Sequence, residues 1–169
     1  MPKEEVTDLL FFLRTFPSEV RECALWLRDF IWDLYPQANE LIYDNYNALA
    51  VGWSPTKKMS HIFCSFALYR GGNYNTHFGF YWGAELSDPH KILIGEGKQY
   101  RYLLVNDIEA FPQQEIKKLV DEAWQNSLAK VKDAKQLTQG KTIVKMVSIS
   151  AKRNSKRLRI SAVKVYKSL

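Results

Sequence analysis

The sequence predicts an α+β fold in which an antiparallel sheet of about five or six strands packs against helices. Two amphipathic helical patterns open the chain, and strand-like segments joined by short turns occupy its middle. One further helical pattern follows the strands. Strands joined by short hairpin turns pair in antiparallel fashion, so the order helix, helix, strands, helix indicates this class.

Two helices are predicted at the start of the chain. The first, over residues 4–14, has apolar residues at helical spacing and is ended by Pro17. The second, over residues 18–35, has Ser18 as a suitable N-cap and ends at Pro36. Its apolar positions form one face, which comprises Val20, Ala24, Leu27, Ile31 and Leu34.

The middle of the chain is rich in strand signals. Residues 48–53 follow a turn-like Asn-Tyr-Asn and are predicted to form a strand. Residues 61–70 and 75–83 are aromatic and β-branched, and Gly71-Gly72-Asn73 between them is a strong hairpin signal. Residues 100–105 are predicted to form another strand after a glycine-punctuated loop.

The last third of the chain divides into a helix and a basic extension. Residues 113–131 place apolar side chains on one helical face. Residues 143–150 and 158–166 are β-prone, and either a terminal hairpin or a flexible tail fits them. We therefore expect one α+β domain over residues 1–135 and a basic C-terminal extension over residues 136–169.

Composition favours a cytoplasmic globular protein. The chain of 169 residues is 46% hydrophobic and 14% aromatic, which is ample for a core. No apolar run reaches the ~18 residues of a membrane span, and the acidic N-terminus does not resemble a signal peptide. The two cysteines, Cys23 and Cys64, fit a reducing compartment without disulfides.

The net charge of +6 belongs to the C-terminal segment. Residues 141–169 hold nine Lys or Arg and no acid, while the rest has 15 basic and 18 acidic residues. Such a segment can bind polyanions, including nucleic acid, in a salt-dependent way. A solubilising tail or a lysine-protected sheet edge is the favoured explanation, because edge lysines protect against aggregation. The candidate contacts are Lys152, Arg153, Lys156, Arg157 and Arg159.

Three segments resemble the YdhG-like family of small bacterial domains, a domain family of unknown function. They are residues 34–43, residues 78–89 and the glycine-rich residues 93–101, and the likeness covers about residues 20–125. The resemblance implies a compact α+β fold with a curved antiparallel sheet, in a superfamily shared with frataxin-like proteins. Some relatives are linked to intracellular iron handling. Residues 43–46 and the basic segment depart from the family pattern.

A stripe of carboxylates on the second helix is a candidate metal site. It lies opposite the apolar face, with Trp26 in line, and comprises Glu19, Glu22, Asp29 and Asp33. Carboxylate oxygens can hold a hard cation weakly, and frataxin-like iron chaperones use an acidic helix. We expect no cofactor overall, and iron is the one that this pattern would suggest. The solvated face of an ordinary amphipathic helix gives the same pattern.

The glycine-rich loop is a candidate anion site. Gly95 and Gly97 free backbone N–H groups to face an anion, and Lys98 and Arg101 supply positive charge. A tight turn with both cations in solvent is the alternative. The loop lacks the spacing of a phosphate-binding P-loop.

Aromatic residues from the predicted strands could line a ligand pocket. The set comprises Trp53, Phe63, Phe66, Tyr69, Tyr74, Phe78, Phe80, Tyr81 and Trp82. Gly79 and Gly83 share a strand face with Tyr81, which leaves room for a flat ligand or a crossing helix. His61 and Cys64, three apart on a strand, face opposite ways and cannot chelate one ion. Cys64 and His77 lack a third group that would orient a nucleophilic pair.

The function that these patterns favour is a non-enzymatic binding domain. No acid–base pair, nucleophile or cofactor fingerprint stands out. We expect a small ligand or a protein partner either against the sheet or on the loop of residues 95–101. The alternatives are a frataxin-like iron chaperone and a protein that binds nucleic acid through residues 141–169. The aromatic sheet edge also leaves homo-oligomer formation open, and no membrane association is expected.

Overall fold

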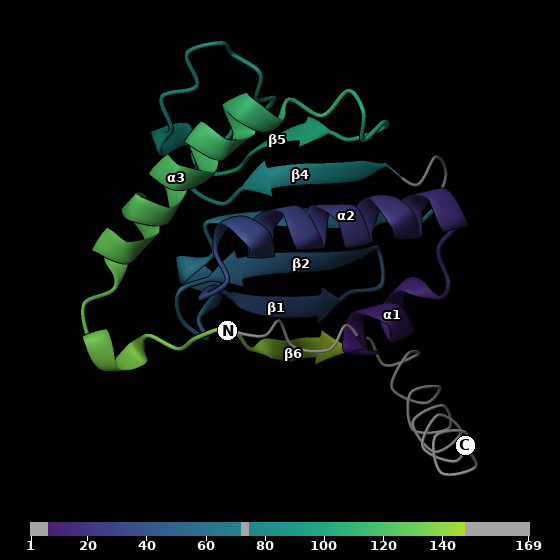
Figure 1. The fold of residues 1–169 in the computed structure, drawn as a ribbon, viewed down its shortest axis with the longest axis horizontal. Helices are drawn as coiled ribbons and strands as arrows, with labels where there is room; N and C mark the ends of the chain where they lie inside the picture. Colours follow the sequence, from purple (N-terminus) through teal and green to yellow (C-terminus); the bar gives the residue numbers. More distant parts are fainter. Residues whose placement is uncertain (1–6, 72–74, 148–169) are drawn as a thin grey trace.

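The computed structural model describes residues 7–71 and 75–147, which form a sheet with helices on one side (Figure 1). The helices are α1 (Thr7–Leu13), α2 (Ser18–Leu34) and α3 (Gln113–Lys130). The α+β class predicted from the sequence is confirmed. In the described residues, none of the helices combines the length and the apolar character that crossing a bilayer requires.

The sheet has six strands in the order β5-β4-β3-β2-β1-β6. Neighbours from β1 to β5 pair antiparallel, but β6 pairs parallel to β1, so the sheet is mixed. The parallel pair exists because α3 carries the chain from β5 back to the other edge of the sheet. The strands are β1 (Asn39–Asp44), β2 (Ala48–Ser54), β3 (Cys64–Tyr69), β4 (Thr76–Phe80), β5 (Arg101–Leu104) and β6 (Thr142–Val147).

The strand β1 is the one central element that the sequence pattern did not indicate. Its sequence, NELIYD, begins with two polar residues, and both Asn39 and Glu40 are buried. Such a segment lacks the alternation by which a half-buried strand is recognised. The predicted strand over residues 61–70 also begins late, because residues 59–61 form a 3₁₀ turn.

The core lies between the helices and one face of the sheet. One row of cross-strand partners on this face is entirely apolar and comprises Ile42, Val51, Phe66, Phe78 and Leu103. Residues of α1, α2 and α3 all join the same buried cluster. The three helices therefore cover the same face, as Figure 1 shows for α2 and α3.

The edge strand β6 is tied to the rest of the sheet through Asn39. The Asn39 side chain donates hydrogen bonds through Nδ2 to the Ser54 carbonyl at 3.1 Å and to the Thr138 carbonyl at 3.0 Å. Its side-chain oxygen accepts a hydrogen bond from the Lys141 amide at 3.3 Å. Residues 142–147, the start of the predicted basic extension, thus lie in the sheet. The β-prone residues 158–166 are outside the described residues.

Candidate functional site

The sheet face opposite the helices, called the open face below, has small residues at its centre and large ones at its sides. Strand alternation and pairing place two rows of side chains on this face. One row consists of Tyr43, Ala50, Ala67, His77 and Leu104. The other consists of Leu41, Gly52, Ser65, Gly79 and Tyr102. The sequence therefore places small residues in the middle of this face, called the floor below, and bulky residues on both sides of them.

The strands β1 to β5 place none of their acidic or basic side chains on the open face. Their charged residues are Glu40, Asp44 and Arg101, and all three lie on the helix-covered face by register. This reverses the usual pattern, in which the sheet face without helices carries the polar and charged residues. Other side chains cover part of this face, because Leu41, Ser65 and Ala67 are only 0%, 8% and 9% exposed.

The ring of Tyr100 lies directly over Gly79. A Cβ atom at position 79 would overlap with the Tyr100 ring, so the glycine provides the space that the ring fills. Tyr100 also stacks with Tyr102 at 5.9 Å and meets Tyr81 edge to face at 6.5 Å between ring centroids. Residues far apart in the chain thus form one aromatic layer over the small floor.

His77 joins this layer on its other side. Its ring stacks with Tyr102 at a centroid distance of 4.3 Å and contacts Tyr69 at 4.7 Å. Burial lowers the pKa of His77, so the neutral imidazole is favoured. We call the set the tyrosine face, and it comprises Tyr43, Tyr69, His77, Tyr81, Tyr100 and Tyr102.

The Tyr43 and Tyr100 phenols of the tyrosine face are neutral hydrogen-bonding groups. Burial, followed by the nearby Tyr69, raises the pKa of Tyr100 to about 12, although a hydrogen bond with Ser65 opposes the shift. Burial, followed by the nearby Tyr81, also raises the pKa of Tyr43. The Tyr43 hydroxyl is buried and has no hydrogen-bond partner among the described residues. A phenol in that position can donate to an acceptor supplied by a ligand.

The glycine-rich loop positions Tyr100 and Tyr102. Ile94 and Tyr102 exchange two backbone hydrogen bonds, at 2.6 and 3.0 Å, so residues 94 and 102 are held side by side. Gly95 has φ of +124°, a value that residues with a Cβ rarely adopt. The loop therefore turns the chain back so that Tyr100, whose ring lies over the sheet, stands directly before β5.

The predicted anion-binding residues have different surroundings in this loop. The Arg101 guanidinium donates to the Gly97 carbonyl and, at 3.0 Å, to the Tyr100 carbonyl. Its stem packs on Gly83. Lys98, Gly95 and Gly97 are exposed. Arg101 thus holds the loop closed through carbonyl oxygens, and this is a structural use of its positive charge.

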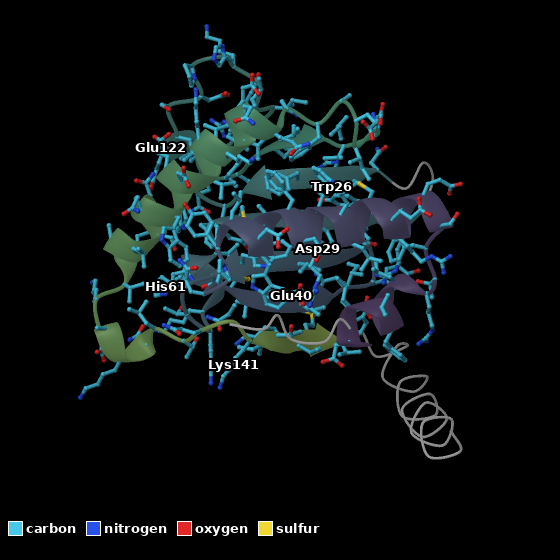
Figure 2. The ribbon with its side chains drawn as sticks, in the orientation of Figure 1. Trp26, Asp29, Glu40, His61, Glu122 and Lys141 are labelled. Carbon is cyan, nitrogen blue, oxygen red and sulfur yellow. The ribbon has the colours of Figure 1, made fainter. Side chains whose placement is uncertain are left out.

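The predicted acidic stripe lies along the outer side of α2. Glu19, Glu22, Asp29 and Asp33 are all exposed, and Figure 2 labels Asp29 on this helix. Among the described residues, no three His, Cys, Asp or Glu side chains gather in a way that could hold a metal ion. Trp26 belongs to the core boundary, where it stacks on Phe30 at 5.3 Å.

Arg28 has a role that the sequence analysis missed. It is buried and donates through Nε to Glu40 of β1 at 2.7 Å, with 4% and 0% of the two side chains exposed. Its guanidinium also lies over the Trp32 ring at 4.4 Å. The Glu40 carboxylate accepts a further hydrogen bond from Thr142 of β6 at 3.1 Å. This ion pair joins α2 to β1, the strand next to the edge strand β6, and Figure 2 labels Glu40.

The histidine and cysteine candidates are separated by the sheet. Cys64 faces the core, where burial raises its pKa well above the ordinary value, whereas His77 lies on the open face. His61 is buried near α3, and its Nδ1 lies 2.8 Å from the Thr56 hydroxyl. Cys64, His77 and His61 therefore lie in three separate environments, and their side chains do not form one site.

The aromatic residues predicted to line a pocket divide between the two faces. The core contains Trp53, Phe63, Phe66, Phe78 and Phe80. Tyr69 and Tyr81 belong to the tyrosine face, while Tyr74 is outside the described residues. Sequence reasoning missed Tyr43, Tyr100 and Tyr102, although alternation within their strands carried the signal. Trp82 donates to the Ser60 carbonyl at 3.2 Å.

Two hollows lie away from the tyrosine face. One, of about 110 Å³, lies between α3 and the turn at residues 87–92, beside Glu122. The other, of about 190 Å³, lies beside Phe111 and the end of β5. The nucleic-acid candidates Lys152, Arg153, Lys156, Arg157 and Arg159 are outside the described residues.

Comparisons with protein-family models, curated proteins and solved structures give no match to this chain. The case for a site therefore rests on the geometry of the chain itself. The tyrosine face combines a buried phenol, Tyr43, with strand residues that place no acidic or basic side chain on it.

Proposed function

We propose that this domain binds a small, uncharged and largely flat molecule on the tyrosine face. The observation that carries the proposal is the absence of acidic and basic side chains from the open face of β1 to β5, combined with its layer of aromatic rings. The sequence-based expectation placed a ligand either on the sheet or on the loop of residues 95–101. The proposal selects the sheet.

The charge of the ligand follows from the groups that surround it. Burying an ion without a partner costs on the order of several kcal/mol, because nothing replaces the hydration that it loses. The tyrosine face offers neutral phenols and an imidazole whose lowered pKa favours the neutral form. An uncharged molecule therefore loses the least hydration free energy when it leaves water for this face.

The shape of the ligand follows from the floor. Ala50 and Ala67 are the small residues at its centre, whereas the Tyr100 ring fills the space above Gly79 and Ile62 that above Gly52, so these groups limit the width of the site. Pockets for small molecules are mostly apolar with a few placed polar groups. Burial of ~200 Å² of apolar surface contributes about 5 kcal/mol before the costs of association, so modest affinity is expected.

The test is a fluorescence titration of the full chain with Nile red, a neutral, flat probe. We expect saturable binding that the Tyr102→Ala substitution weakens about tenfold, because Tyr102 stacks with both His77 and Tyr100. The matched control is Tyr46→Ala, since Tyr46 is 83% exposed in the turn between β1 and β2.

Two results would count against the proposal. One is binding that does not saturate. The other is equal affinity in the Tyr102→Ala variant, once its circular dichroism shows that it has folded. A second probe tests the charge argument: benzoate is flat but anionic and should bind much more weakly than its neutral methyl ester.

A further inference from the structure

The tyrosine face contains one hydrogen-bonding group without a partner. The Tyr43 hydroxyl is buried and makes no hydrogen bond among the described residues. Tyr100, on the same face, is different because its phenol has Ser65 as a partner. A buried donor that lacks a partner costs about 1–3 kcal/mol, so such groups call for an explanation.

The position of Tyr43 in the sheet places its ring beside the proposed site. Tyr43 stands at the end of the row that continues through Ala50 and Ala67, so its ring borders the small floor. The Tyr81 phenol, from the far side of the same floor, is near enough to act on it electrostatically. The hydroxyl is therefore part of the layer that a bound molecule would enter.

We infer that the Tyr43 hydroxyl is a specificity-determining donor that selects ligands with an uncharged hydrogen-bond acceptor, such as a ketone or ether oxygen. This inference rests on the proposed function. A phenol can donate to a carbonyl oxygen, and the bond satisfies a group that is otherwise buried without a partner. A carboxylate would also accept this bond, but no cation on β1 to β5 faces it.

The burial of the hydroxyl also defines how the ligand is held. Because solvent does not reach the Tyr43 oxygen, an acceptor can meet it only by entering the aromatic layer. A molecule that rests on top of the rings would not contact it. Recognition by Tyr43 therefore requires that the acceptor and the flat body be on one compact molecule.

The test compares two probes of nearly equal shape, acetophenone and α-methylstyrene. They differ in that a carbonyl oxygen replaces a methylene group. Both are titrated into the full chain, and binding is followed by NMR. We expect the ratio of their affinities to shift by about fivefold to tenfold against acetophenone when Tyr43 is replaced by Phe. Tyr43→Phe keeps the ring and removes an unpartnered hydroxyl, so the fold should be retained.

The matched control is Tyr46→Phe, which removes an exposed hydroxyl away from the face and should leave the ratio unchanged. If both probes bind and Tyr43→Phe does not change their ratio, the role of Tyr43 is refuted while the proposed function stands. If neither probe binds the wild-type protein, both the role of Tyr43 and the proposed function are refuted.

Discussion

Gly79 is the residue on which the tyrosine face most directly depends. The space above it is filled by the ring of Tyr100, and a methyl group there would overlap with ring atoms. Two residues separated by the long turn and loop after β4 are thus fitted to each other. This pairing is visible only in the fold, because the sequence shows a glycine in a strand and a tyrosine near a loop.

Replacing Gly79 by Ala should destabilise the protein by about 1–3 kcal/mol, because the added methyl group overpacks the layer. Urea unfolding measures the change. The Tyr100→Ala substitution in the same chain should recover part of the loss, since it removes the group that the methyl meets. Strict additivity of the two substitutions would show that the two positions do not interact.

Gly97→Ala is the matched control for this experiment. A Cβ atom at position 97 meets no atom within 4 Å, so little change in stability is expected. A loss as large as that of Gly79→Ala would mean that loss of glycine, rather than the overlap with Tyr100, causes the effect.

His77 should make stability depend on pH. Its pKa in the fold is lowered by burial, so the unfolded chain binds the proton more readily than the folded one. The contribution of this pKa difference to the free energy of unfolding is complete above about pH 6.5, and it is lost as the pH falls toward the pKa of His77 in the folded protein. The same direction holds for His61, whose pKa is lowered by burial and by Lys58.

The His77→Phe substitution keeps an aromatic ring in the stack and removes its titration. Urea unfolding at about pH 7.5 and about pH 5.5 should then show a smaller loss of stability on acidification than in the wild type. An identical loss in both proteins would show that His77 does not titrate in this range.

At the scale of elements, the buried Arg28–Glu40 pair fixes α2 to the strand β1. Glu40→Gln removes the 2.7 Å partner of a buried guanidinium, and a loss of about 3–5 kcal/mol is expected. Chemical denaturation measures it. Glu85→Gln is the control, because the Lys130–Glu85 pair is exposed and should contribute less than about 1 kcal/mol. Equal losses would contradict the assigned role of burial.

Periodicity predicted the helices well and the sheet in part. Residues 18–35 and 113–131 have clear apolar faces, and α2 and α3 match them to within a residue. The strand β1 was missed because its first two buried residues are polar and are satisfied by distant groups, Arg28 and Thr138. No local pattern contains those partners.

The sequence predicted some residues of the candidate site but not their arrangement. The aromatic residues and Gly79 were recognised, but their division between two faces depends on strand register, which the sequence does not state. The role of Arg28 was likewise hidden, since a charged residue on an amphipathic helix is usually exposed.

At the scale of the whole molecule, the sheet separates two different chemical environments. One face is the apolar core under three helices, and the other is an uncharged aromatic layer. The edge strand β6 completes both faces beside β1, with Leu41 opposite Ile143 and Ile42 opposite Val144. The start of the basic segment is therefore part of the sheet.

A chain that ends at Gly140 should be less stable than one that ends at Val147. The shorter chain lacks β6 and loses the packing of Val144 and Val147 against the core, for which about 2 kcal/mol or more is expected. Thermal and urea unfolding of the two truncated chains provide the comparison. Equal stability would show that β6 contributes nothing to the fold.

The most direct test of the tyrosine face is to locate a bound neutral ligand. Amide chemical shifts of the full chain are measured by two-dimensional NMR during a titration with acetophenone. We expect saturable shifts centred on Ala50, Ala67 and Gly79, which form the floor under the rings. Shifts centred instead on the hollow beside Glu122, or on Gly95 and Gly97, would contradict the assignment of the binding site to the sheet.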